Sequence, residues 1–92
     1  MPVPAAKTAY IGTWKGKDMS LTIAPSGKIA YKRVYSAEKK VDLLIELASF
    51  HGDDFNAGFG MFHSTFVVSK PPVMAGGKTK MVVDGIELTK EN

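Results

Sequence analysis

The chain has 92 residues, 45 % of them hydrophobic, which is one domain's worth of sequence and too apolar for a disordered segment. The absence of cysteine excludes disulfides, thiol catalysis and cysteine-based zinc sites. The net charge of +3 comes from lysines scattered along the chain, whereas nucleic-acid binders usually cluster their positive charge on one face, and no apolar run is long enough for a membrane span. These features indicate one globular domain, with the cytoplasm and the envelope both open as compartments.

Residues 1–9 are predicted to form a flexible leader, because Pro2 and Pro4 oppose regular structure. From Tyr10 onward apolar and polar residues alternate with a period of two, which predicts strands. The first three expected strands cover residues 10–15, 19–23 and 29–35, separated by turns at 16–18 and 24–28. The second and third are expected to pair as a hairpin.

Residues 36–47 allow two interpretations. The apolar residues from Val41 to Leu47 alternate without interruption, which favours a strand. A short helix that begins at Ser36 would also bury a stripe of leucines. We prefer the strand, because the segment lies between other strands.

The second half of the chain continues the pattern. After a turn at 52–54, residues 55–61 alternate around two glycines, which is typical of a bulged strand. A β-branched strand is predicted at 65–69, and Pro71 and Pro72 are expected to end it because neither can donate to a ladder. Asp84-Gly85 between two apolar runs predicts a type I′ hairpin.

The expected fold is therefore all-β, with about seven or eight short strands in residues 10–92. Consecutive hairpins favour an antiparallel meander, and closing the meander into a barrel or sandwich removes its exposed edges.

Gly12-Thr13-Trp14 resembles the Gly-x-Trp start of lipocalins and related calycin barrels, in which the tryptophan packs across one end of the barrel. A wider set of motifs is similar to small uncharacterised bacterial β-proteins, which share this Gly-Thr-Trp start and a Val-Asp-Gly-x-Glu-Leu-Thr tail. In this chain the wider set is Gly12–Trp14, Met19–Ile23, Gly52–Phe55, Ser69–Pro72 and Val83–Thr89. The resemblance implies a shared lipocalin-like fold and an envelope location, and it transfers no catalytic residue.

Four residues are candidates for ligand binding. Alternation places Arg33 on the core face with Tyr31 and Tyr35, where a guanidinium requires acceptors. One hypothesis is that the three bind an anionic head group in the barrel interior. The alternative is a bulge or strand end that exposes Arg33, or an ion pair with a neighbouring carboxylate (Asp42 or Glu46). Trp14 is expected to plug the core, with ligand stacking as its other role.

An aromatic block further along the chain is a candidate interface. Phe55, Phe59, Met61 and Phe62 cannot all face one side of a regular strand. Contiguous apolar surface usually marks an interface, so we expect part of the block to be covered by a second copy. The alternative is a bulged strand buried within one barrel.

The sequence contains few residues that suggest catalysis. His51 and His63 are the only histidines, and a metal site needs three or four convergent ligands, so neither a metal nor a cofactor is expected. A small hydrolase that uses His51 with Asp54 is a minor alternative. The leading hypothesis is a non-enzymatic β-barrel binding domain that forms a homo-oligomer and takes a small amphipathic or anionic ligand.

A second alternative is a single-stranded nucleic-acid binder on an OB-like or SH3-like barrel. The tyrosines at 10, 31 and 35 would stack on bases, and Lys32 or Arg33 would contact phosphates.

Overall fold

The computed structural model describes residues 1–91. Within that range nine antiparallel strands form one sheet in the order β6-β5-β4-β3-β2-β1-β9-β8-β7. The elements are a short 3-10 helix η1 (Ala5–Tyr10), then β1 (Gly12–Gly16), β2 (Met19–Ile23), β3 (Lys28–Val34), β4 (Lys40–His51), β5 (Asp54–Phe59), β6 (Phe62–Phe66), β7 (Val68–Ala75), β8 (Lys78–Val83) and β9 (Ile86–Lys90). The all-β prediction is confirmed, with slightly more strands than expected.

The sheet consists of two meanders. Strands β1 to β6 each pair with the next along the chain, and β7 to β9 do the same. Asp84 and Gly85, with φ angles of 50° and 80°, supply the two positive φ values that a type I′ turn between β8 and β9 requires. The two meanders are joined where β1 pairs with β9, through Trp14↔Lys90 and Lys15↔Thr89.

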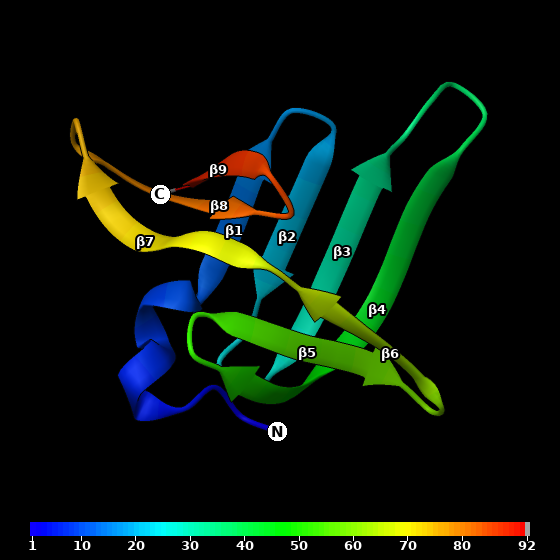
Figure 1. Ribbon diagram of the computed structural model, residues 1–92, viewed down its shortest axis with the longest axis horizontal. Coiled ribbons are helices and arrows are strands. Elements are labelled where there is room, and N and C mark those ends of the chain that lie inside the picture. Colours follow the sequence, from blue (N-terminus) through cyan, green and yellow to red (C-terminus); the bar gives the residue numbers. More distant parts are fainter. Residues whose placement is uncertain (92) are drawn as a thin grey trace.

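The sheet curls strongly, because its two edge strands are nearly contiguous in the chain. β6 and β7 lie at opposite ends of the strand order, yet Val67 alone separates them. Figure 1 shows the result: β5, β6 and β7 run across the face formed by β1 to β4. The N–H of Val67 donates to Asp84 Oδ1 (2.9 Å), and the N–H of Val68 donates to Asp54 Oδ1 (2.7 Å). Two carboxylates therefore hold the joint between the edges.

The inner face of the curled sheet is filled by side chains. Trp14 is fully buried, and its Nε1–H donates to the Tyr10 carbonyl (2.9 Å). The Tyr10 hydroxyl in turn donates to the Asp53 carbonyl (2.9 Å), so η1 closes one end of the core. The largest fully buried side chains are Trp14, Phe55, Leu21, Ile29, Met81, Leu88 and Val83.

The segment predicted as a flexible leader lies against the sheet. The terminal ammonium of Met1 donates to the Leu47 carbonyl (2.7 Å), and the N–H of Val3 donates to the Pro25 carbonyl (3.0 Å). Val3 also packs on the core. The prolines keep this segment out of the sheet, but the terminal ammonium of Met1 and the N–H of Val3 find acceptors on β4 and on the turn between β2 and β3.

Two local predictions had different outcomes. The strand interpretation of 41–47 is confirmed, because these residues lie within β4. The expectation that Pro71 and Pro72 end a strand is wrong, since β7 continues through both. β7 is an edge strand with a register shift between Lys70 and Val73, so neither proline has to donate to a ladder.

Candidate functional site

A cavity of about 220 Å³ opens between β3, β4 and β6, on the inner side of the sheet. We call it the mouth cavity. It is mostly apolar, and Tyr31, Tyr35, Val41, Leu43, Ile45, Phe62, Ser64, Phe66 and Asp84 line it. The period of two along β3 directs Tyr31 toward it, Tyr35 lies just beyond the end of the same strand, and the aromatic residues of β6 form the opposite wall.

The two tyrosines differ in depth. Tyr31 belongs to the core and packs edge-on against Phe66, with ring centroids 5.1 Å apart, whereas Tyr35 is half exposed at the rim. Burial raises the pKa of Tyr31; its interaction with Tyr35 acts in the same direction and its interaction with Arg33 opposes it. The Tyr31 phenol therefore stays protonated near neutral pH and can donate a hydrogen bond.

Arg33 lies beside the cavity, and the Asp84 carboxylate is near enough to act on its charge. Its guanidinium is 4.7 Å from the Tyr35 ring centroid, and Lys39 Nζ is 5.2 Å from the same centroid. Within residues 1–91 Arg33 forms no ion pair, so the predicted pairing with Asp42 or Glu46 does not occur. The structure thus brings three of the four predicted ligand residues together, at the exposed end of β3.

The fourth predicted ligand residue lies elsewhere. Trp14 is fully buried in the core, its N–H is used by the Tyr10 carbonyl, and Lys90 Nζ lies 4.9 Å from its ring. This placement agrees with the core-plug interpretation and leaves the indole no surface to offer a ligand.

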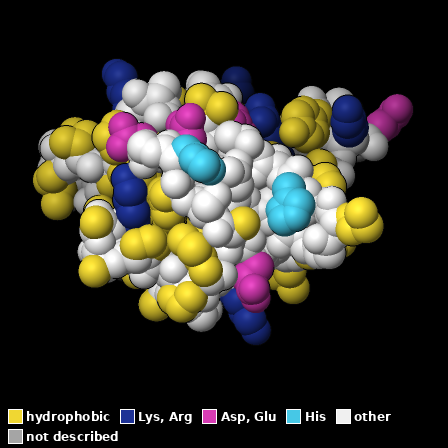
Figure 2. All heavy atoms as spheres, turned by 60° about the horizontal axis from the view of Figure 1, so that its bottom comes forward, with side chains coloured by type: hydrophobic (Ala, Val, Ile, Leu, Met, Phe, Trp, Pro, Cys, Tyr) yellow, Lys and Arg dark blue, Asp and Glu magenta, His cyan; other side chains and the backbone are white. Residues whose placement is uncertain are grey.

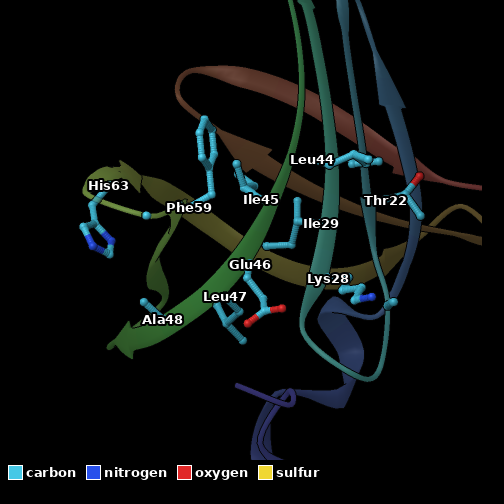
Figure 3. Close-up of a pocket in the computed structure, with 14 residues that line it drawn as sticks. Thr22, Lys28, Ile29, Leu44, Ile45, Glu46, Leu47, Ala48, Phe59 and His63 are labelled. Atoms are coloured by element: carbon cyan, nitrogen blue, oxygen red, sulfur yellow. The ribbon is translucent and has the colours of Figure 1, made fainter.

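A larger and more open hollow of about 710 Å³ lies on the outer side of β2 to β5. We call it the outer groove. Small residues such as Ala24, Ala30 and Gly58 line it, and Leu44 beside them is 80 % exposed. Figure 3 shows Leu44 and Glu46 on β4, with Phe59 and His63 coming from the β5–β6 hairpin. Sequence analysis missed Leu44, although an apolar residue on the polar face of a strand is itself a signal.

The predicted aromatic interface divides between the core and the surface. Phe55 is 1 % exposed and stacks on Phe66 with ring centroids 4.9 Å apart, so its assignment to an interface is corrected to the core. Phe59, Met61 and Phe62 are exposed at the tip of the β5–β6 hairpin, with the two phenyl rings 5.6 Å apart. We call these three residues the hairpin tip.

Glycine is required next to this tip. A Cβ on Gly58 would lie 1.9 Å from the Phe62 carbonyl oxygen, so no larger residue fits without moving β6. Gly60 has a φ of 56° and forms the turn itself. The two glycines that interrupt the predicted strand therefore build a tight hairpin.

The two edges of the sheet differ in their chemistry. β7 carries Lys70, Pro71 and Pro72 together with two register shifts, and these features discourage pairing with another chain. β6 pairs with β5 alone, is regular over Phe62–Phe66, and contains neither proline nor lysine. β6 is therefore the unprotected edge.

His51 and Asp54, which were considered for catalysis, are cross-strand partners in the β4–β5 ladder, but their side chains make hydrogen bonds to other groups. Both histidines are exposed and lie apart at the surface (Figure 2), and no group of three or more metal-ligating side chains occurs in residues 1–91. His51 Nε2 contacts Ser49 Oγ (3.3 Å), and the Asp54 carboxylate accepts the Val68 N–H. One oxygen of the Asp54 carboxylate is thus used in the joint between β6 and β7.

The stacking platform of a nucleic-acid binder is not assembled either. Tyr10 and Tyr31 are buried, which leaves Tyr35 as the one exposed member of the predicted set. Lys32 lies on the outer face of β3, opposite the tyrosines.

Within the described residues no helix is long and apolar enough to cross a bilayer. Comparison of the chain with protein families, with curated proteins and with solved structures found no significant match in any of the three.

Proposed function

We propose that this protein is a non-enzymatic β-sheet interaction domain that self-associates through the edge strand β6 and the hairpin tip. The observation that carries the proposal is the contrast between the two edges of one sheet. The proline-bearing β7 is protected, while β6 is regular, uncharged and flanked by exposed phenyl rings. An unprotected edge of this kind serves as a template for another strand.

Some backbone N–H and C=O groups of β6 do not bond to β5 and are available to another strand. In an antiparallel ladder alternate residues bond to a given neighbour. Counted from the pair Phe59↔Phe62 that closes the turn, His63 and Thr65 direct their N–H and C=O groups away from β5. A second copy of β6, related by a two-fold axis, presents the same groups in return.

Apolar surface next to this edge supports the same partner. The hairpin tip is continuous with the outer groove through Phe59, and Leu44 extends the apolar area onto β4. Contiguous exposed apolar surface is unusual on a monomer. A second copy bound here would pair the open edge of β6 and bury the exposed rings in one contact.

The hairpin tip is tested with Met61→Lys, because Met61 is fully exposed and its side chain supports no packing. We expect the wild-type chain to form a dimer or larger species in size-exclusion chromatography with light scattering. Met61→Lys should weaken association by about tenfold or more. The matched control is Met74→Lys on the β7 edge, where the methionine is also exposed and association should be unchanged. A wild-type chain that stays monomeric at its highest soluble concentration would refute the proposal.

Strand pairing is tested separately with Thr65→Pro. This change removes the outward N–H and leaves the β5 ladder intact, at the cost of one exposed hydrogen bond from Thr65 to Asn56 Oδ1 (2.6 Å). The variant should be monomeric with an unchanged circular dichroism spectrum. A folded Thr65→Pro variant that associates as the wild type does would exclude β6 as the interface.

A further inference from the structure

We infer that the mouth cavity binds a small amphipathic carboxylate, with the apolar tail between β4 and β6 and the carboxylate on Arg33. The cavity shares Phe62 with the hairpin tip, but the proposed head-group residue Arg33 lies on β3, so the inference does not rest on self-association.

The size and lining of the cavity define the tail. A cavity of roughly 150 Å³ holds a benzene ring. The mouth cavity, at about 220 Å³, has room for a ring and a few methylene groups. Val41, Leu43 and Phe62 supply apolar contacts, and the buried Tyr31–Phe66 pair closes the inner end. A few polar groups at the edge of an apolar cavity are typical of small-molecule sites.

The charges at the rim define the head group. Arg33 and Lys39 both lie over Tyr35, and neither has a carboxylate partner within residues 1–91. Asp84 is the one carboxylate among the cavity-lining residues, and its Oδ1 already accepts the Val67 N–H. Arg33 and Lys39 are therefore available to an anion at the rim, although Asp18 and Glu87 also line the hollow beside Arg33, Glu87 being paired with Lys80.

The geometry of Arg33 suits a carboxylate. Tyr35 lines both the mouth cavity and the neighbouring hollow that Arg33 lines, so the guanidinium is next to the cavity entrance. A guanidinium binds a carboxylate through two parallel hydrogen bonds, and the protonated Tyr31 phenol is a further donor close to Arg33.

The experiment titrates the protein with three probes that share one tail: hydrocinnamate, hydrocinnamyl alcohol and phenylpropylamine. Binding is followed by NMR shifts of the Val41 and Leu43 methyl groups, which line the cavity. We expect hydrocinnamate to bind with a Kd of about 0.1 to 1 mM, the alcohol about tenfold more weakly, and the amine more weakly still. Tighter binding of the amine would show that Asp84 and the aromatic rings select a cation, and would overturn the proposal.

Variants locate the head group. Arg33→Gln should weaken hydrocinnamate about tenfold and leave the alcohol unchanged. Lys32→Gln is the matched control, because it removes one positive charge from the outer face of the same strand and should change neither. Equal affinity of wild type and Arg33→Gln for hydrocinnamate would exclude Arg33, and the absence of methyl shifts with any probe would exclude the cavity. The titration is repeated in Met61→Lys, the variant expected to weaken self-association. Ligand binding is read from the methyl shifts and association from light scattering, so the two results are measured separately.

Discussion

Trp14 and Arg33 show how far single residues could be predicted. The size of Trp14 and its place in an alternating strand predicted a core position, which the structure shows. Its hydrogen bond to Tyr10 was not predictable, because it depends on η1, a helix that forms where the two prolines indicated a leader. Alternation also predicted that Arg33 shares a face with both tyrosines, and the end of β3 explains why that face is partly solvated there.

Tyr10 gives the protein a pH dependence of stability. Burial, and then the charges of Asp53 and Asp54, raise the pKa of Tyr10 to about 12. The unfolded phenol titrates near pH 10, so the native state holds its proton more tightly. The stabilisation is complete below about pH 10 and is lost between about pH 10 and 12, on the order of 2 kcal/mol.

Urea unfolding at a series of alkaline pH values measures this effect, with Tyr10→Phe as the comparison. The phenylalanine variant is expected to be less stable at neutral pH, because it lacks the hydrogen bond to Asp53, and to lose the tyrosine-linked part of the alkaline decline. Parallel stability profiles for the two proteins would contradict the assignment.

At the scale of elements, hairpins were more predictable than edges. Turn chemistry at Asp84-Gly85 and the alternation in 41–47 are local signals, and both predictions held. Which strands lie at the edges depends on long-range pairing, which local periodicity does not encode. Local periodicity therefore predicts a strand end at Pro71, where β7 continues, and it groups Phe55 with Phe59, although one lies in the core and the other at the tip.

The joint between β6 and β7 depends on Asp54. Val68 is buried, and its N–H has the Asp54 carboxylate as acceptor. Asp54→Ala leaves this donor without a partner and should lower the free energy of unfolding by about 1–3 kcal/mol. Asp54→Asn keeps an acceptor oxygen and should recover most of the loss in chemical denaturation. Equal free energies of unfolding for the alanine and asparagine variants would show that the hydrogen bond from the Val68 N–H does not contribute to stability.

For the whole molecule, the sequence predicted an antiparallel meander closing on itself but not its order. The pairing of strands that are neighbours in the chain can be predicted from the short turns between them. The pairing of β1 with β9 joins opposite ends of the chain, and no local sequence pattern predicts it. The candidate site shows the same limit. β3 alone predicted Tyr31, Arg33 and Tyr35 as a group, but the opposite wall comes from β6, which only the curl of the sheet brings near.

Amide hydrogen exchange should follow this architecture. Amides of β1 and β2, at the centre of the sheet, are expected to exchange most slowly. The outward amides of His63 and Thr65 should exchange fast in dilute protein and more slowly as the concentration rises, because a second copy then pairs with them. Amides of β7 serve as the internal control and should not respond to concentration. If the exchange rates of the β6 amides did not change with protein concentration, pairing at this edge would be contradicted.

The single-residue joint at Val67 also has a consequence for the order of folding. Residues on either side of it form meanders built from local turns, and the one ladder between them joins β1 to β9. Such local hairpins close quickly, while contacts between distant parts of a chain form late because more chain entropy is lost. We therefore expect the first and last strands to meet last, and a chain truncated before Ile86 to keep its first meander while leaving β1 as a new open edge.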